Sequence, residues 1–204
     1  MITGSPNEHG QLLLRFREKG DVDAFDRLIV AYQKPLYNYL LKLLQNKEDA
    51  EDGLQEIWIK VIRQCGSYQE KGRFSSWIFC IAHNYCLDLF RRRRHRINDE
   101  EFVETRNGLA LLDIIPANVF TPSEAAMEKE MMALLEHEIK DMPVLIREVY
   151  LLRAQHGIPF KEIAEIQKSP LGTVLSRMHQ AVKWLEPIIR LYMKESDPKT
   201  EESA

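Results

Sequence analysis

The chain has 204 residues, of which 45% are hydrophobic and 29% charged, and its formal net charge is −3. This apolar content suffices for one large or two small globular domains. No apolar run approaches the ~18 residues that a membrane span needs, and residues 1–11 lack the basic and apolar parts of a signal peptide. We therefore expect a cytoplasmic protein that does not insert into membranes.

Helical patterns fill the first 65 residues, and no stretch shows convincing strand alternation, so an all-α fold is predicted. Two helices are expected over about 7–19 and 22–44, interrupted at Gly20, with Asp21 or Asp23 as N-cap of the second. A third is expected over about 48–65. Its apolar residues recur at helical spacing and predict one stripe facing a core: Leu54, Ile57, Trp58, Val61, Ile62 and Cys65. Another face of this helix carries Asp49, Asp52, Gln55 and Glu56. A solvated surface would explain such a face on an arbitrary helix.

A fourth helix, expected over about 74–96, ends in a block of five arginines and one histidine: Arg91, Arg92, Arg93, Arg94, His95 and Arg96. One or two cations would suffice to stabilise a helix C-terminus. Four consecutive arginines repel one another, which favours a polyanion as their partner. The loop before this helix contains Tyr68 and Arg73, side chains of the kind that can stack on an unpaired base, although a plain surface loop is the alternative.

An acidic segment divides the chain, because residues 97–141 hold eleven acidic against three basic residues. Its first part, residues 97–121, has a glycine, a proline and no sustained period, which predicts a flexible linker. Residues 143–194 are basic again, with eight Lys or Arg against four Asp or Glu. We therefore expect two small helical domains, 1–96 and 122–194, and a disordered tail over 195–204.

Residues 157–185 have the pattern of a helix, a tight turn and a second helix. Ser169 is expected as N-cap of the second helix and Pro170 as its first residue. Apolar residues at spacings of three and four predict its buried side, and its outward side is expected to carry Thr173, Ser176, Arg177 and Gln180, flanked by Leu175 and His179. Such side chains can contact base edges and phosphates in the major groove. Plain packing units share this pattern, so DNA binding and packing remain alternatives here.

Four segments together resemble a known family: "GDVDAFDRLIVAYQKPLYNYL", "DAEDGLQEIWIKVI", "FSSWIFCIAHNYCLDLFRRRR" and "MPVLIREVYLLRAQHGIPFKEIAEIQKSPLGTVLSRMHQAVKWL". They are similar to the successive motifs of the two-domain bacterial sigma factors of the extracytoplasmic-function type, within the sigma-70 family. The resemblance implies a first domain that binds the clamp of core RNA polymerase and melts the minus-ten promoter element. It implies a second domain that reads the minus-thirty-five element, and an anti-sigma factor as a further partner.

The same resemblance implies roles for individual residues. The face with Asp49, Asp52, Gln55 and Glu56 would dock on the polymerase clamp helices. Minus-ten DNA would be contacted by Tyr68, Arg73 and Asn84, with Arg91, Arg92, Arg93 and Arg94 near backbone phosphate. The minus-thirty-five element would be read by Thr173, Leu175, Ser176, Arg177, His179 and Gln180.

The chain also departs from its relatives. Cys80 and His83 stand where relatives often carry arginine, and Leu175 and Gln180 stand at positions that are often basic. Glutamine suits adenine, and leucine suits a thymine methyl group. We therefore expect less guanine-directed readout than in relatives.

Two other classes of function fit the sequence less well. A stand-alone helix-turn-helix regulator would not need the acidic face over residues 49–56. An enzyme built on Cys80, His83, Cys86 and Asp88 would have them along one helix, without a second carboxylate, a phosphate-binding loop or a metal-ligand set. The three cysteines follow no usual zinc spacing, so free thiols are expected. We expect no enzymatic activity, no catalytic residue, no metal and no cofactor.

Overall fold

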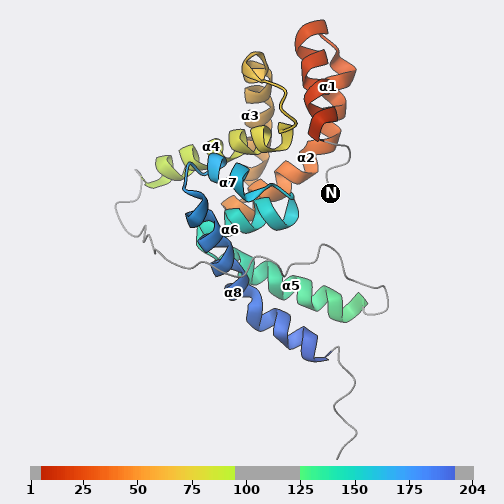
Figure 1. Ribbon diagram of the computed structural model, residues 1–204. Coiled ribbons are helices and arrows are strands. Elements are labelled where there is room, and N and C mark those ends of the chain that lie inside the picture. The colour runs from red at the N-terminus through yellow and green to blue at the C-terminus, as the bar shows by residue number, and fades with distance from the viewer. Residues whose placement is uncertain (1–5, 95–124, 196–204) are drawn as a thin grey trace, which may run out of the picture.

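The computed structural model describes residues 6–94 and 125–195, which form eight α-helices with no strand among them (Figure 1). The predicted all-α fold is thus confirmed. The expected linker over 97–121 lies outside the described residues, and so does the expected tail apart from Glu195, the last residue of the last helix. The fourth helix is described as far as Arg94, so residues 95–96 also lie outside.

The N-terminal region consists of four helices: α1 Pro6–Lys19, α2 Val22–Leu44, α3 Lys47–Gln64 and α4 Phe74–Arg94. Asp21 is the N-cap of α2, as predicted, and its side chain accepts a hydrogen bond from the Ala24 N–H at 3.0 Å. Asn46 caps α3 in the same way by accepting from the Asp49 N–H at 3.0 Å. This cap fixes the start of α3 and places the Asp49 carboxylate in its first turn, where the helix dipole favours negative charge.

The C-terminal region consists of α5 Ala125–Asp141, α6 Val144–Tyr150, a π-helical turn over Leu151–Gln155, α7 Phe160–Ile166 and α8 Leu171–Glu195. The predicted helix-turn-helix is α7, a four-residue turn and α8. Lys168 in the turn has a left-handed backbone, with φ of 49°. Helix α8 begins one residue later than predicted, because the Pro170 carbonyl accepts the first hydrogen bonds of the helix. The Ser169 hydroxyl contacts Gln167 and Arg177 and does not cap α8.

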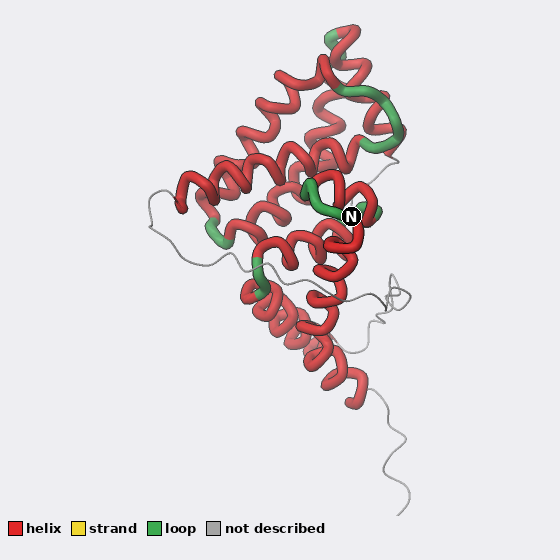
Figure 2. The backbone as a smooth tube through the Cα atoms, turned by 60° about the vertical axis from the view of Figure 1, so that its left-hand side comes forward, coloured by secondary structure: helices red, strands yellow, loops and turns green. Residues whose placement is uncertain are grey.

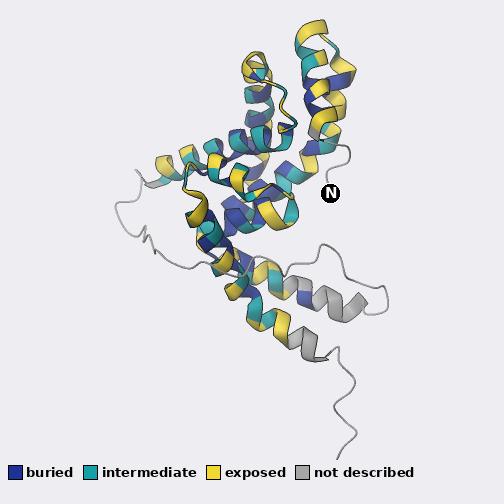
Figure 3. Cartoon of the chain, viewed as in Figure 1, coloured by how far each residue is buried: buried dark blue, intermediate teal, exposed yellow. Residues whose placement is uncertain are grey.

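The two regions pack against each other and share one continuous hydrophobic core. Helix α4 lies beside α7, and α2 lies beside α5 and α6 (Figures 1 and 2). Buried residues gather where α2, α4 and α6 meet (Figure 3). The N-terminal part of α8 packs on α6, and its C-terminal part runs alongside α5, away from α1 to α4 (Figure 1). The chain therefore adopts a closed arrangement of its two predicted domains.

Candidate functional site

The acidic face of α3 is present and faces outward. Asp52 and Gln55 are exposed, and Glu56 is half-exposed. Asp49 is more enclosed, with 20% of its side chain exposed, because Arg93 of α4 forms an ion pair with it. The face is therefore accessible at Asp52, Gln55 and Glu56, whereas Asp49 also ties α3 to α4.

Two apolar side chains extend this face, and the sequence patterns did not assign them to it. Ile59 is 41% exposed and Ile62 is 47% exposed. With Asp52 and Gln55 they recur at spacings of three, four and three, and so form one stripe along α3. The prediction that Ile62 belongs to the core is wrong, because Ile57 and Val61 already fill the side of α3 that faces α2 and α4. We call Asp52, Gln55, Glu56, Ile59 and Ile62 the α3 stripe.

The arginine block at the end of α4 is partly neutralised within the chain. Arg91 Nη1 lies 3.4 Å from Asp88 Oδ1, and Arg92 Nε donates to the Asp88 carbonyl at 3.3 Å. Arg93 pairs with Asp49. Arg91 and Arg92 are exposed, and Arg94 is the last helical residue described. The exposed pair can reach an anion in solvent, and Asp88 and Asp49 offset part of the repulsion between the arginines.

The loop before α4 differs from the expected open loop. Tyr68 is only 5% exposed: its ring packs on Trp77 with centroids 4.9 Å apart, and its hydroxyl donates to Glu70 at 3.1 Å. In this arrangement its ring cannot stack on a base. Arg73 Nη1 lies 3.2 Å from Glu165 Oε2 of α7, and Asn84 is half-buried with its amide directed to Cys80 Sγ at 3.6 Å. Tyr68 and Asn84 are thus held by contacts within the N-terminal region, whereas Arg73 is exposed and paired with α7.

Helix α8 presents a different outward face from the predicted one. Ser176 is buried at 8% exposure and accepts a hydrogen bond from Gln180 Nε2 at 3.3 Å, so its assignment to the outward face is wrong. The physical reason is that α8 packs on α6 as well as on α7, which covers more of its circumference than a two-helix motif requires. Thr173, Leu175 and Gln180 are half-exposed, and His179 is exposed. Lys183, exposed one turn beyond His179, extends this side and was missed.

Arg177 lies in a polar chain that starts in the turn of the helix-turn-helix. It donates to Gln167 Oε1 at 2.8 Å and to the Ser169 hydroxyl at 3.1 Å. Gln167 in turn donates to Glu148 Oε2 at 2.7 Å. The guanidinium of Arg177 is therefore directed toward the turn in this arrangement.

The residues of the enzyme hypothesis do not come together. Cys86 is buried, and burial raises the pKa of its thiol well above the ordinary range. Burial also raises the pKa of Cys80, and His83 is turned to Glu148, with Nδ1 2.7 Å from Oε1. Asp88 is exposed beside Arg91. All three cysteines are free thiols, and the described residues contain no cluster of His, Cys, Asp and Glu that could hold a metal.

His156 gives the closed arrangement a pH dependence. Its ring lies between the two regions, 4.4 Å from the ring centroid of Phe79, and its Nε2 is buried without a hydrogen-bond partner. Burial, with a further contribution from the Lys42 ammonium, lowers the pKa of His156 from 6.5 to about 4. The closed chain thus disfavours the imidazolium, so the contribution of neutral His156 to closure is fully present above pH 6.5 and is lost as the pH falls toward 4.

We expect acidification from pH 7 to about 5.5 to expand the wild-type chain more than the His156→Phe variant, measured by small-angle X-ray scattering. Phenylalanine keeps the contact with Phe79 but has no proton to bind. His83 and Glu148, which face the same interface, are present in both proteins, so the comparison isolates the substitution at His156. Equal expansion of the two proteins would show that His156 does not couple closure to pH.

No helix among the described residues combines the length and apolarity that crossing a membrane requires.

Two family models match the chain, in the order in which the two regions occur. Sigma-70 region 2 matches residues 28–96, and Sigma-70 region 4 matches residues 130–185. The first match runs from within α2 to the arginine block, and the second contains α7, the turn and α8 as far as residue 185.

Curated relatives match over nearly their whole length. The chain is 29% identical over 173 residues to the ECF RNA polymerase sigma factor SigW of Bacillus subtilis, covering 85% of this chain and 92% of that protein. It is 28% identical over 194 residues to the RNA polymerase sigma-H factor of Pseudomonas aeruginosa, covering 90% and 97%. It is 29% identical over 189 residues to the ECF RNA polymerase sigma-E factor of Escherichia coli, covering 88% and 96%.

A solved structure shares the fold. The sigma factor RpoE from Bartonella quintana, crystallised in complex with the anti-sigma factor NepR, superposes with a TM-score of 0.61 at 20% identity, covering 82% of this chain and 97% of that one.

Proposed function

We propose which surfaces of this chain bind core RNA polymerase and which bind promoter DNA, from the premise that the chain belongs to the sigma-70 family of RNA polymerase sigma factors. Members of this family bind both partners. The chain is an alternative sigma factor of the extracytoplasmic-function type, which directs promoter-specific initiation of transcription. Its site of action is the cytoplasm, where polymerase and promoter meet. We assign polymerase binding and the minus-ten element to residues 1–96, the connection to 97–121 and the minus-thirty-five element to 122–194.

The α3 stripe is the proposed surface for core polymerase. Asp52 and Gln55 supply exposed polar contacts, and Ile59 and Ile62 supply apolar area beside them. Protein interfaces combine an apolar centre with charges that set orientation and association rate. This stripe is the observation that carries the proposal, because a DNA-binding regulator that acts without polymerase has no use for it. Asp49 would act at the edge of the same surface.

The minus-ten element is proposed to bind at α4 and the loop before it. Arg91 and Arg92 are exposed cations on the last turns of α4, and we assign them to bind backbone phosphate. Arg73 would reach bases once its ion pairs with α7 are broken, and Asn84 once its amide turns away from Cys80. Tyr68 would stack on an unpaired base only after its ring leaves the packing against Trp77.

The minus-thirty-five element is proposed to bind at α8. Thr173, Leu175, His179 and Gln180 lie on the accessible part of the helix, and Lys183 adds a cation one turn further on. Arg177 would contribute by turning from Gln167 to the DNA. Ser176 would act only through Gln180, since its hydroxyl is buried and accepts the Gln180 amide.

An anti-sigma factor is the proposed further partner. The neighbour in Bartonella quintana was solved with such a protein, and the present chain shares its fold. An inhibitor that binds the closed arrangement would keep Arg73 paired with α7 and the two regions together.

The two DNA surfaces should respond differently to substitution. Replacing Arg91 and Arg92 with Gln removes phosphate contacts, so promoter binding should weaken similarly for all sequences and become less salt-dependent. Gln180→Ala removes a base-edge hydrogen bond worth about 1–3 kcal/mol of discrimination, so preference should relax at one upstream base pair. The measurement is transcription by reconstituted holoenzyme on a promoter library randomised in both elements.

Lys161→Gln is a matched control, because Lys161 is exposed on α7 outside both proposed surfaces. If Gln180→Ala changed preference in the minus-ten element, or the arginine replacements changed it in the minus-thirty-five element, the assignment of the regions would be wrong.

A further inference from the structure

Two adjacent charged residues of α6 are buried at the contact between the regions. Arg147 is 5% exposed and Glu148 is 1% exposed. Burial of a charge is unfavourable unless opposite charges and hydrogen bonds compensate for its lost hydration. The groups that compensate these two charges therefore determine which arrangement of the chain is stable.

Glu148 takes two of its three side-chain partners from the N-terminal region. Its Oε1 accepts the Tyr39 hydroxyl of α2 at 2.5 Å and lies 2.7 Å from His83 Nδ1 of α4. Its Oε2 accepts Gln167 Nε2 at 2.7 Å from within its own region. Separation of the regions would remove both contacts to Oε1, so the carboxylate is satisfied as a buried group only in the closed chain.

Arg147 joins the same two regions through main-chain carbonyls. Its Nη1 donates to the carbonyls of Lys42 and Leu43 at 3.1 and 3.2 Å, at the C-terminal end of α2. Its Nη2 donates to the carbonyls of Lys140 and Met142 at 2.8 and 2.7 Å, at the end of α5. One cation thus stabilises the negative ends of a helix from each region.

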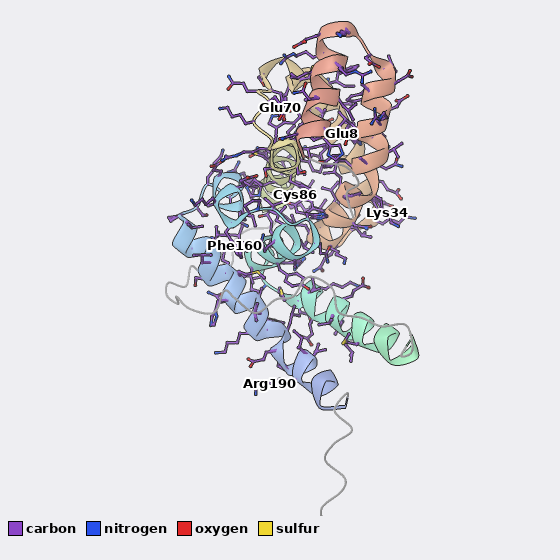
Figure 4. The ribbon with its side chains drawn as sticks, turned by 45° about the vertical axis from the view of Figure 1, so that its right-hand side comes forward. Glu8, Lys34, Glu70, Cys86, Phe160 and Arg190 are labelled. Atoms are coloured by element: carbon purple, nitrogen blue, oxygen red, sulfur yellow. The ribbon has the colours of Figure 1, made fainter. Side chains whose placement is uncertain are left out.

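The closed arrangement also engages Arg73 of the proposed minus-ten surface. Arg73 pairs with Glu162 and Glu165 of α7 at 3.6 and 3.2 Å, and Ser76 of α4 contacts Glu162. Figure 4 labels Cys86 on α4 and Phe160 on α7, the two helices that lie side by side here. Helix α4 and the first helix of the helix-turn-helix therefore cover each other.

Promoter geometry requires these helices to separate. The minus-ten and minus-thirty-five elements lie about 25 base pairs apart, or roughly 85 Å along the duplex at 3.4 Å per base pair. A chain in which α4 touches α7 cannot contact both elements. The thirty residues 95–124 connect the regions, and a polypeptide of that length spans at most about 100 Å. The covalent connection thus permits the separation that promoter binding needs.

We propose that Glu148 is a lock that holds the free chain closed through Tyr39 and His83, that Arg147 supports it through the carbonyls of α2, and that the lock is released when the regions separate on core polymerase. Once the regions part, water can hydrate both charges, so a polar lock of this kind reopens more readily than an apolar contact of the same area. The consequence for promoter binding rests on the function proposed above, whereas the lock itself is a property of the free chain.

The test removes the lock from its N-terminal side, which leaves the C-terminal region unchanged. The Tyr39→Phe/His83→Leu double variant keeps apolar volume in the core but leaves the Glu148 carboxylate with Gln167 as its remaining side-chain partner. Tyr32→Phe is the matched control, because Tyr32 is a buried tyrosine whose hydroxyl contacts His9 and Ser75 within the N-terminal region. Circular dichroism at 222 nm verifies that each variant is folded.

We expect small-angle X-ray scattering of the free double variant to show an expanded chain, with the open-to-closed ratio raised at least about tenfold, while the control stays compact. Affinity for core polymerase should not fall in either protein. A double variant that is folded and as compact as the wild type would overturn the lock. An expanded variant that gains no affinity for a promoter duplex would support the lock and count against the proposed DNA surfaces, so the two failures are distinguishable.

Discussion

Replacing Asp52 and Glu56 with lysine is expected to abolish binding to core RNA polymerase while leaving the fold intact. Asp52 is exposed and Glu56 is half-exposed, and neither side chain contributes to the core. The two substitutions together add four units of positive charge to this surface. A polymerase surface that pairs with acidic side chains would repel them, and like charges brought together across an interface cost several kcal/mol. The measurement is co-purification with core polymerase, followed by titration of labelled protein.

The control for this experiment carries the same change of charge elsewhere. Asp26 of α2 and Glu186 of α8 lie outside the α3 stripe, and the Asp26→Lys/Glu186→Lys variant should bind core polymerase like the wild type. Ile59→Ser/Ile62→Ser examines the apolar part of the stripe and should weaken binding without adding charge. Wild-type affinity in the Asp52→Lys/Glu56→Lys protein would exclude the α3 stripe as the polymerase surface.

The second large effect is expected on promoter DNA. The free chain should bind a promoter duplex with no more than the micromolar affinity typical of non-specific contacts, whereas the holoenzyme should bind it at least about a hundredfold more tightly. The reason is that Arg73 is paired with α7 and Arg93 with Asp49 in the closed chain, and its net charge of −3 gives little general attraction to DNA.

This comparison requires the same duplex, salt and temperature for both species, because phosphate contacts depend steeply on salt. A duplex with both elements scrambled is the matched control for sequence-specific binding. Nanomolar, sequence-specific binding by the free chain at physiological salt would identify a regulator that acts without polymerase.

The helices could be predicted from sequence because their signals are local. Apolar spacing located α1 to α4, and Asp21 was identified as a cap because a short acidic side chain stands just before an amphipathic stretch. The turn between α7 and α8 was located by Pro170, which interrupts the helical pattern, although the helix begins one residue later. Signals of this kind depend only on neighbours within a few positions.

The details of the site depend on neighbours far along the chain. Ile62 follows the helical period of the core stripe, but its side chain is 47% exposed in the structure of residues 6–94 and 125–195. Ser176 has the polarity of a surface residue, but it is buried on α8, which packs on both α6 and α7. Tyr68 stands in a loop of polar composition, yet Phe74 and Trp77 lie close enough to enclose its ring.

The contact between the regions was the least predictable part. Glu148 lies 109 positions from Tyr39 and 65 from His83, and no local pattern relates residues so distant. One signal was present, since Arg147 and Glu148 interrupt the apolar stretch "VLIREVYLL". A charged pair inside such a stretch indicates either that the two side chains are exposed to solvent or that they are buried with compensating partners. The fold is needed to distinguish these two cases.

The central claim is that this chain directs core RNA polymerase to particular promoters, and transcription from genomic DNA of the organism that carries the gene tests it most directly. Purified core polymerase is incubated with that DNA with and without the chain, and the 5′ ends of the transcripts are sequenced. We predict a set of start sites that appears only when the chain is present, with shared sequence elements about 10 and 35 base pairs upstream. Identical 5′ ends in both reactions, together with no co-purification of the chain with core polymerase, would contradict the account.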